Sequence, residues 1–196
     1  MDGGVVLAIA AGLVLLVLAS YGAVLYNRLV ALKHNVAQAW SNIDVLLKQR
    51  HDELPKLVAT CKEYMGYEQA TLTRVMEARG QVQQARDRGD VPALGAAESG
   101  LRMGLGQLFA LAEAYPDLKA DSQFQHLADR ISGLENAIAD RREYYNQSVN
   151  SNNIRIEQFP DVLVARLFAF HPFDLLRFGQ EETGDVDMAA LFGGSV

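Results

Sequence analysis

The sequence holds one compact acid–base cluster, His51-Asp52-Glu53, which comes shortly before Pro55. A histidine beside carboxylates is a combination that general acid–base catalysis uses, so a hydrolase with its site at these three residues is one hypothesis. Aspartate is also a favoured helix cap, and proline is tolerated in the first turn of a helix, where its missing N–H needs no partner. We therefore predict that the cluster belongs to a helix-reversing turn and has no catalytic role.

The other reactive residues form no known catalytic or metal-binding motif. The four histidines, His34, His51, His126 and His171, lie in separate segments, and none completes the Glu-x-x-His spacing of a dimetal helical bundle. The nucleophile-elbow, P-loop and dinucleotide-binding glycine patterns are also missing from the sequence. The single cysteine, Cys61, is predicted to be a buried apolar residue of a helix. We predict no enzymatic activity, no metal site and no cofactor.

The charge balance argues against a nucleic-acid partner. The 196 residues carry a formal net charge of −6, and no basic stripe interleaved with aromatic residues occurs. Phosphate backbones are bound by clustered lysines and arginines that release counterions, which this composition does not supply.

The stretch Val5–Tyr26 contains no charged residue and is long enough to cross a hydrocarbon core of about 30 Å as a helix. A cleavable signal peptide is the alternative, but it needs a positively charged start and a shorter apolar stretch, whereas Asp2 precedes this one. We predict a transmembrane anchor, with the lipid bilayer as a partner. Because Arg28, Lys33, Lys48 and Arg50 follow the span and no Lys or Arg precedes it, the positive-inside rule places the N-terminus outside and the rest of the chain in the cytoplasm.

Four amphipathic helices are expected after the span. Apolar residues recur at steps of three and four from Leu29 onward, and nothing between Tyr26 and Leu29 breaks a helix. Short polar segments with capping aspartates and prolines interrupt this pattern three times. The predicted turns are Arg50–Pro55, capped by Asp52; Asp87–Gly95, capped by Asp90; and Ala114–Phe124, capped by Asp121. The predicted helices are Leu29–Leu47, Glu53–Arg88, Val91–Ala114 and a fourth from Asp121 to about Asn153. This pattern predicts an all-α fold, an antiparallel up-down-up-down four-helix bundle with an N-terminal transmembrane helix.

The topology returns the chain to the bilayer after about Asn153. The segment Phe159–Phe178 is rich in Phe and Leu, and it either lies in the membrane interface or forms an extra helix that closes the bundle. The acidic stretch from Gly179 is predicted to be disordered. The expected domains are an anchor at 1–26, the helical bundle at 27–153, a Phe-rich membrane-proximal segment at 154–178 and a tail at 179–196.

Three groups of residues are candidate contact surfaces. Small residues on one face of a membrane helix allow close helix packing, and a similar small-residue row occurs in the third predicted helix. Chance in an alanine-rich span and simple tolerance of glycine are the alternatives. The candidates are Ala8, Gly12, Ala19 and Ala23 in the span; Ala96, Gly100 and Gly104 in the third helix; and Phe168, Phe170 and Phe173 in the Phe-rich segment.

Two polar-aromatic groups, Tyr26-Asn27 and Tyr144-Tyr145-Asn146, are placed by the topology at the same membrane-proximal end. We predict that they hydrogen-bond to one another at the base of the bundle, with a ligand site as the alternative.

Several blocks of the chain resemble one known family. They are YNRLVALKHNVAQAWSNIDVLLKQRHDELPKLVATCKEY (26–64), EARG (77–80), LAEAYPDLKADSQFQHL (111–127) and YYNQSVNSNNIRIEQFP (144–160). Together they closely resemble the LemA family over about residues 26–170. The resemblance implies a single-pass bacterial membrane protein with an antiparallel helical bundle and no established enzymatic activity. Many relatives have Asn after the proline of the first turn, where this chain has Lys56. One branch of the family is associated with magnetosome membranes, and no residue here decides membership of it.

These observations predict a non-enzymatic, membrane-anchored scaffold of the bacterial inner membrane that acts as a homo-oligomer or by binding other membrane proteins. An accessory subunit of a membrane protease or transporter, or a magnetosome-type membrane organiser, is the alternative.

Overall fold

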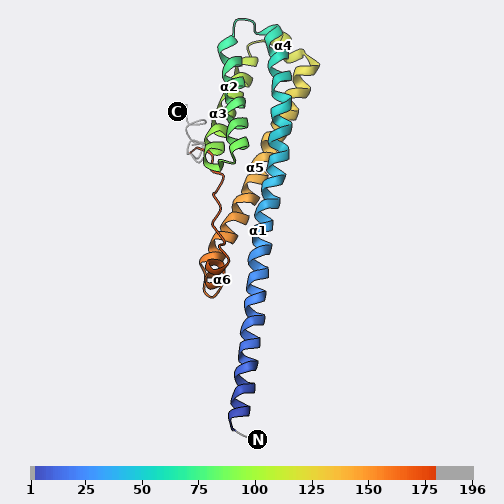
Figure 1. Cartoon of the computed structure of the whole chain (residues 1–196). Coiled ribbons are helices and arrows are strands. Elements are labelled where there is room, and N and C mark those ends of the chain that lie inside the picture. The colour runs from blue at the N-terminus through green and yellow to red at the C-terminus, as the bar shows by residue number, and fades with distance from the viewer. Residues whose placement is uncertain (1–2, 180–196) are drawn as a thin grey trace, which may run out of the picture. The chain divides into compact units, whose positions relative to one another are not determined.

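The computed structural model describes residues 3–179, and all regular secondary structure in this range is helical (Figure 1). The all-α class predicted from the sequence is therefore confirmed for these residues. The six helices are α1 (Gly3–Tyr64), α2 (Gln69–Arg88), α3 (Val91–Ala112), α4 (Pro116–Ala120), α5 (Ser122–Glu157) and α6 (Asp161–Leu167). The predicted acidic tail, apart from Gly179, lies outside the described residues.

Helix α1 is a single helix of 62 residues that carries the apolar stretch Val5–Tyr26 into the amphipathic part of the chain. Its N-terminal part is long and apolar enough to cross a membrane, and the most apolar 18-residue window is not buried by the protein. The predicted continuity between the apolar stretch and the helix that follows is confirmed.

The predicted reversal at Arg50–Pro55 is wrong, because α1 passes through Pro55 as an uninterrupted helix. The buried face of α1 continues across this segment at Leu47, Arg50 and Leu54, at steps of three and four. Arg50 occupies a position where the helical pattern of buried residues requires an apolar side chain. Because arginine is charged, the apolar pattern in the sequence is interrupted there although the helix continues. Proline removes one backbone hydrogen bond from a helix, and packing of the flanking turns offsets that loss.

The first reversal lies instead between α1 and α2, at Met65–Glu68, so the helix predicted over Glu53–Arg88 is divided. The Glu68 N–H donates to the Met65 carbonyl (3.0 Å), which closes the turn around Gly66. Met65 is fully buried and holds the turn to the core. A buried methionine beside a glycine carries a weaker turn signal than the Asp-Glu-Leu-Pro segment, which explains why the sequence pattern points to the wrong place.

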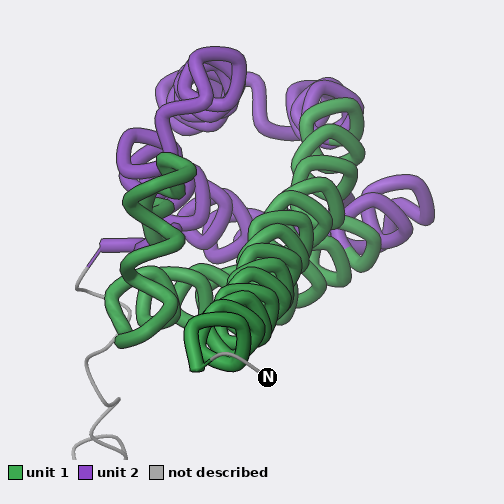
Figure 2. The backbone as a smooth tube through the Cα atoms, turned by 60° about the horizontal axis from the view of Figure 1, so that its bottom comes forward, with its two compact units in different colours: residues 1–53, 129–175 green, residues 54–128, 176–196 purple. Residues whose placement is uncertain are grey.

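The described chain divides into two compact units, shown in green and purple in Figure 2. Unit 1 comprises residues 1–53 and 129–175, and unit 2 comprises residues 54–128 and 176–196. Both α1 and α5 contribute to each unit, because each helix continues through the boundary.

Unit 1 is built on an antiparallel pairing of α1 and α5. Leu29 shares a buried cluster with Ile156, and the Trp40 ring lies 5.5 Å from the Tyr145 ring. Arg50 pairs in the same way with Glu135, so each step forward along α1 is matched by an equal step backward along α5. A constant register of this kind means that the two helices stay in contact along most of their shared length.

Unit 2 contains an antiparallel hairpin of α2 and α3. The α2 helix ends at Gly89, whose positive φ of 65° suits a glycine C-cap. The Ala93 N–H donates to the Asp90 carboxylate (3.0 Å), and Pro92 lies in the first turn of α3, so the predicted start of this helix is confirmed. The Cβ position of Gly104 in α3 would lie 3.5 Å from the Val75 side chain of α2, in ordinary van der Waals contact.

The predicted cap of the fourth helix is also confirmed. The Phe124 N–H donates to Asp121 Oδ1 (2.8 Å), and the Tyr64 hydroxyl donates to Asp121 Oδ2 (3.1 Å). The first of these bonds is the main cause of a lowered pKa of the Asp121 carboxyl. The segment before this cap was predicted to be a turn throughout, but it contains the short helix α4.

Candidate functional site

The acid–base cluster lies inside a helix and not in a turn. His51, Asp52 and Glu53 are consecutive residues in the interior of α1, so their side chains point about 100° apart around the helix. Glu53 is largely buried, and its Oε1 atom forms an ion pair with Arg130 Nη2 of α5 at 3.2 Å. The predicted capping role of Asp52 is wrong, because no helix begins there. The glutamate of the cluster serves helix pairing instead.

Residues 3–179 contain no group of three or more His, Cys, Asp or Glu side chains that could hold a metal ion. Two ion pairs, Arg50 with Glu135 and Glu53 with Arg130, join α1 to α5 in unit 1. These two ion pairs therefore serve the fit between α1 and α5.

Arg50 and Glu135 form a buried ion pair that the sequence alone did not reveal. Arg50 Nη1 donates to Glu135 Oε1 (2.5 Å), and the two side chains are 1% and 15% exposed. A charge this deeply buried is tolerated only with a partner, so the pair fixes the register of α1 against α5. A charged residue at a helix-core position, seven residues from the buried Ile43 on one side and from the buried Leu57 on the other, is the signal in the sequence that could have indicated it.

Cys61 is fully buried at the C-terminal end of α1, as predicted. Burial raises the pKa of its thiol to about 11. We expect Cys61 of the native protein to react with a disulfide reagent at pH 8 orders of magnitude more slowly than Cys61 of the unfolded chain. At this pH only about 0.1% of the native thiol is ionised to the reactive thiolate, and the surrounding side chains block access of the reagent. The measurement is the rate of thiol modification with and without denaturant. A Cys61→Ala/Ser132→Cys variant, with its thiol at an exposed site of α5, is the control and should react rapidly; fast modification of native Cys61 would contradict the prediction.

A pocket of about 520 Å³ lies in unit 1 where the apolar stretch of α1 ends. The ring centroid of Tyr26, at the end of that stretch, lies 4.7 Å from that of Phe168 and 5.9 Å from that of Phe170. Lys33, His34 and His171 also line the pocket, so it combines aromatic surface with basic side chains. This composition suits the boundary between hydrocarbon and phosphate groups better than it suits bond-making chemistry.

The segment after α6, which lines this pocket with Phe173, is hydrogen-bonded to α5. The Asn153 amide makes two hydrogen bonds with the backbone of Phe173, donating to its carbonyl (2.9 Å) and accepting from its N–H (3.0 Å). The Tyr145 hydroxyl donates to the Asp174 carbonyl (2.9 Å), and burial is the main reason that the pKa of Tyr145 rises to about 12. The predicted mutual hydrogen bonding of the two polar-aromatic groups is therefore wrong: Tyr145 binds the C-terminal segment, and Tyr26 packs on phenylalanines.

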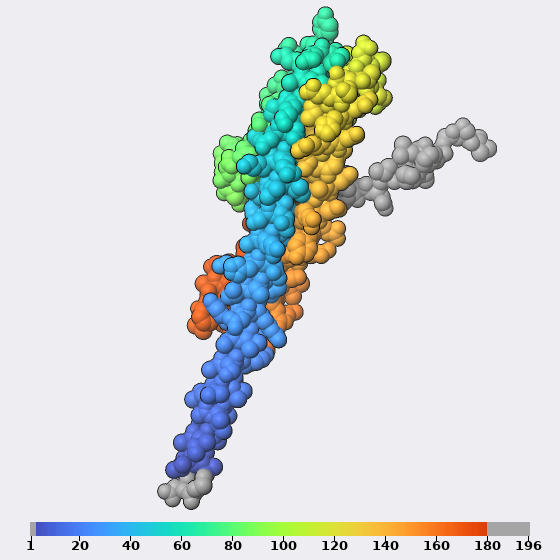
Figure 3. Space-filling model, turned by 90° about the vertical axis from the view of Figure 1, so that its right-hand side faces the viewer, coloured from blue at the N-terminus to red at the C-terminus, as the bar shows by residue number. Residues whose placement is uncertain are grey.

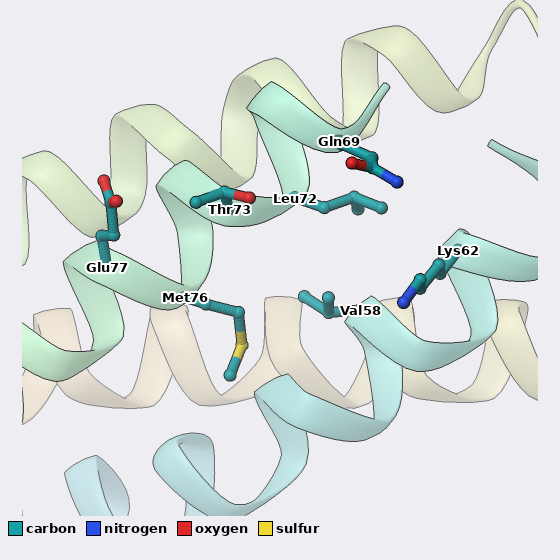
Figure 4. Close-up of a pocket in the computed structure, with 7 residues that line it drawn as sticks. All are labelled: Val58, Lys62, Gln69, Leu72, Thr73, Met76 and Glu77. Atoms are coloured by element: carbon teal, nitrogen blue, oxygen red, sulfur yellow. The ribbon is translucent and has the colours of Figure 1, made fainter. Parts of the chain in front are cut away.

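A second pocket, of about 460 Å³, lies in unit 2 (Figure 4). Val58 and Lys62 come from the end of α1, and five residues come from α2. Val58, Leu72 and Met76 supply apolar surface, with Lys62 and Glu77 beside them. Gln69 and Thr73 complete the lining, so the pocket is a groove between two helices with both apolar and polar surface.

The structure distributes the predicted contact residues over different surroundings. In the span, Ala8, Gly12, Ala19 and Ala23 are all exposed on α1. In α3, Ala96 is exposed, Gly100 is partly exposed and Gly104 is buried against α2. In the Phe-rich segment, Phe168 is exposed, whereas Phe170 and Phe173 are partly buried.

Sequence reasoning missed Gly95 of α3 as a contact residue. A Cβ atom at this position would lie 1.9 Å from the Arg177 carbonyl oxygen, so the C-terminal segment crosses α3 at a point that tolerates only glycine. Nearby, the Gly179 N–H donates to the Ser99 hydroxyl (2.7 Å), and the Arg102 guanidinium lies over the Phe178 ring at 5.7 Å.

Comparison with known proteins gives several matches over most of the chain. The chain is 25% identical over 183 residues to magnetosome protein MamQ 1 of Paramagnetospirillum magneticum and 23% identical over 183 residues to magnetosome protein MamQ of Magnetospirillum gryphiswaldense. Each match covers 82% of this chain and 66% of the relative, so the chain spans just under two thirds of the length of these proteins. Protein LemA of Metamycoplasma hominis is 26% identical over 166 residues, which cover 84% of this chain and 74% of that protein.

The model of the LemA family matches residues 39–189, which include most of α1 beyond the apolar stretch and all five later helices. Because this match covers well over half of the sequence and agrees with the all-helical structure, the chain belongs to the LemA family.

Proposed function

We propose that this chain is a non-enzymatic, membrane-anchored helical scaffold of the bacterial cell envelope that acts by self-association or by binding other membrane proteins. The observation that carries the proposal is the continuity of α1, whose exposed apolar stretch leads directly into the pairing with α5. At 1.5 Å per residue, the part of α1 beyond Tyr26 extends about 57 Å. A helix of this length without a joint, attached to a bilayer, suits a protein that holds partners at a fixed place.

The antiparallel pairing of α1 with α5, and the separate hairpin of α2 and α3, support an up-down-up-down four-helix bundle as the arrangement of the whole helical region. The positive charges Arg28, Lys33 and Lys48 are all exposed on α1 and support an inner-membrane topology with the N-terminus outside and the bundle in the cytoplasm.

A membrane organiser of the magnetosome type is the second candidate, favoured by the similarity to the two magnetosome proteins. It is a special case of the scaffold, since both require an anchored helical body and contacts between copies or partners.

The test uses two full-length variants with the same substitution on opposite faces of the span. Ala19→Leu changes the small-residue face of the span. Ala10 lies nine residues before Ala19, which is two and a half turns of the helix, so Ala10→Leu makes the same change on the opposite face. We expect the wild type and Ala10→Leu to form a defined oligomer in mild detergent and Ala19→Leu to shift toward monomer. The measurement is the mass by light scattering, corrected for bound detergent. A monomeric wild type would contradict self-association and favour the accessory-subunit alternative, which crosslinking in cells would then examine.

A further inference from the structure

Helix α6 has an apolar face that the protein does not cover. Leu163 and Leu167 lie four residues apart in α6 and are 60% and 76% exposed, and Phe159, two residues before the helix begins, is 80% exposed. The opposite face is used: Asp161 and Ala165 are buried. A short helix that packs inward on one face and presents large apolar side chains on the other marks a contact with something outside the chain.

This face adjoins the end of the apolar stretch of α1. Phe168, which follows α6 directly, is itself more than half exposed, and its ring lies 4.7 Å from that of Tyr26. Leu25 is buried, whereas Val24 is exposed, so the protein begins to cover α1 at this level. Figure 3 shows the orange-red atoms of α6 beside the blue atoms of α1. The exposed surface of the apolar stretch thus continues sideways onto α6.

The position of α6 is fixed at both ends, so its outward face is held in place. At its start, Arg155 Nε donates to Asp161 Oδ1 (2.9 Å), a carboxylate that is 2% exposed. After its end, Phe170 packs against a buried cluster of Leu29, Ile156 and Ala165. These contacts make the apolar face a structural feature of unit 1.

Charges near this face suit a phospholipid surface. Arg166 lies in α6 beside Leu163 and Leu167, and Arg28 and Lys33 are exposed on the adjoining turns of α1. Arginine and lysine at such a boundary extend their charged ends toward phosphate groups while their methylene chains remain on apolar surface. The arrangement of an apolar face flanked by cations is typical of helices that lie in the membrane interface.

We propose that α6 and the residues that flank it are a second membrane contact, which inserts Leu163 and Leu167 of the helix, with Phe159 before it and Phe168 after it, into the interfacial region of the bilayer that α1 crosses. The proposal rests on the proposed anchoring by α1 and adds to it: contact at two places would fix the tilt and rotation of the α1–α5 pair against the membrane, which a single span does not do. The occupant is the acyl-chain and phosphate boundary of the lipid, chosen because the face is continuous with the apolar stretch.

The test places a single tryptophan at three positions of the full-length chain. The sequence has one tryptophan, Trp40, so a Trp40→Phe variant has no tryptophan fluorescence and serves as the background. Leu163→Trp reports on α6, Leu15→Trp reports on the span, and Tyr67→Trp, in the exposed turn after α1, is the control. Each protein is reconstituted into phosphatidylcholine vesicles with and without bromine on the acyl chains, which quenches tryptophan on contact.

We expect brominated lipid to remove most of the emission of Leu163→Trp and Leu15→Trp and to leave Tyr67→Trp almost unchanged. Quenching of Leu15→Trp with none of Leu163→Trp would overturn the second contact and leave the anchor intact. No quenching of Leu15→Trp would overturn the anchor and with it both proposals. Far-ultraviolet circular dichroism of each variant checks that the helices are retained.

Discussion

Arg50→Met is expected to lower the free energy of unfolding by about 3 to 5 kcal/mol, because it leaves Glu135 buried without the cation that faces it. The pair joins α1 to α5 within unit 1, where the Arg50 side chain is 1% exposed and the Glu135 side chain is 15% exposed. Removing one member leaves a charge in a region of low dielectric, whereas a methionine fills the same space with apolar atoms. The measurement is urea unfolding of the full-length protein in mild detergent, followed by circular dichroism.

Two further variants separate charge from packing. Lys48→Met makes the same change of residue type at an exposed site of α1 and should alter the free energy by less than about 0.5 kcal/mol. Arg50→Met/Glu135→Met removes both charges and should recover part of the loss, since two apolar side chains can pack where an ion pair lay. The prediction fails if Arg50→Met is no more harmful than Lys48→Met.

Gly95→Ala is expected to destabilise the protein by about 1 to 3 kcal/mol, although alanine is the better helix former. The added methyl group would overlap the Arg177 carbonyl, which belongs to the backbone and cannot rotate away. The segment that carries Leu176, which is buried, must then move off α3. Its displacement would also break the hydrogen bond between Gly179 and Ser99.

Gly106→Ala is the matched control in the same helix. No atom of the described structure outside its own helical turn lies within 4 Å of a Cβ at Gly106, so this change should stabilise α3 by up to about 1 kcal/mol. Hydrogen exchange of the amides at 176–179 should accelerate in Gly95→Ala and stay slow in Gly106→Ala. Equal exchange in the two variants would show that the segment does not depend on the glycine.

Both predictions concern how the chain holds its parts together, and both bear on the proposed scaffold. The ion pair of Arg50 and Glu135 sets the register of the α1–α5 pair, which begins where the apolar stretch ends. The Gly95 crossing holds the C-terminal segment on α3. A scaffold transmits position through such contacts, so their loss should weaken assembly as well as stability.

The sequence by itself determined the features that depend on neighbouring residues. The apolar stretch Val5–Tyr26 follows from composition and length, and the starts of α3 and α5 follow from Asp90 and Asp121, whose carboxylates accept N–H groups three residues away. Helical periodicity established the all-α class and the burial of Cys61.

Only the tertiary structure decided the features that depend on distant residues. Whether the chain turns at Pro55 depends on Arg50, which can occupy a core position because Glu135 lies 85 residues further along the chain. The role of Gly95 also depends on a distant residue, because the Arg177 carbonyl leaves no room for a side chain at position 95. A local pattern records which positions are apolar, whereas a buried charge or a close backbone crossing is stable only with its partner in place, and that partner is known only once the helices have packed.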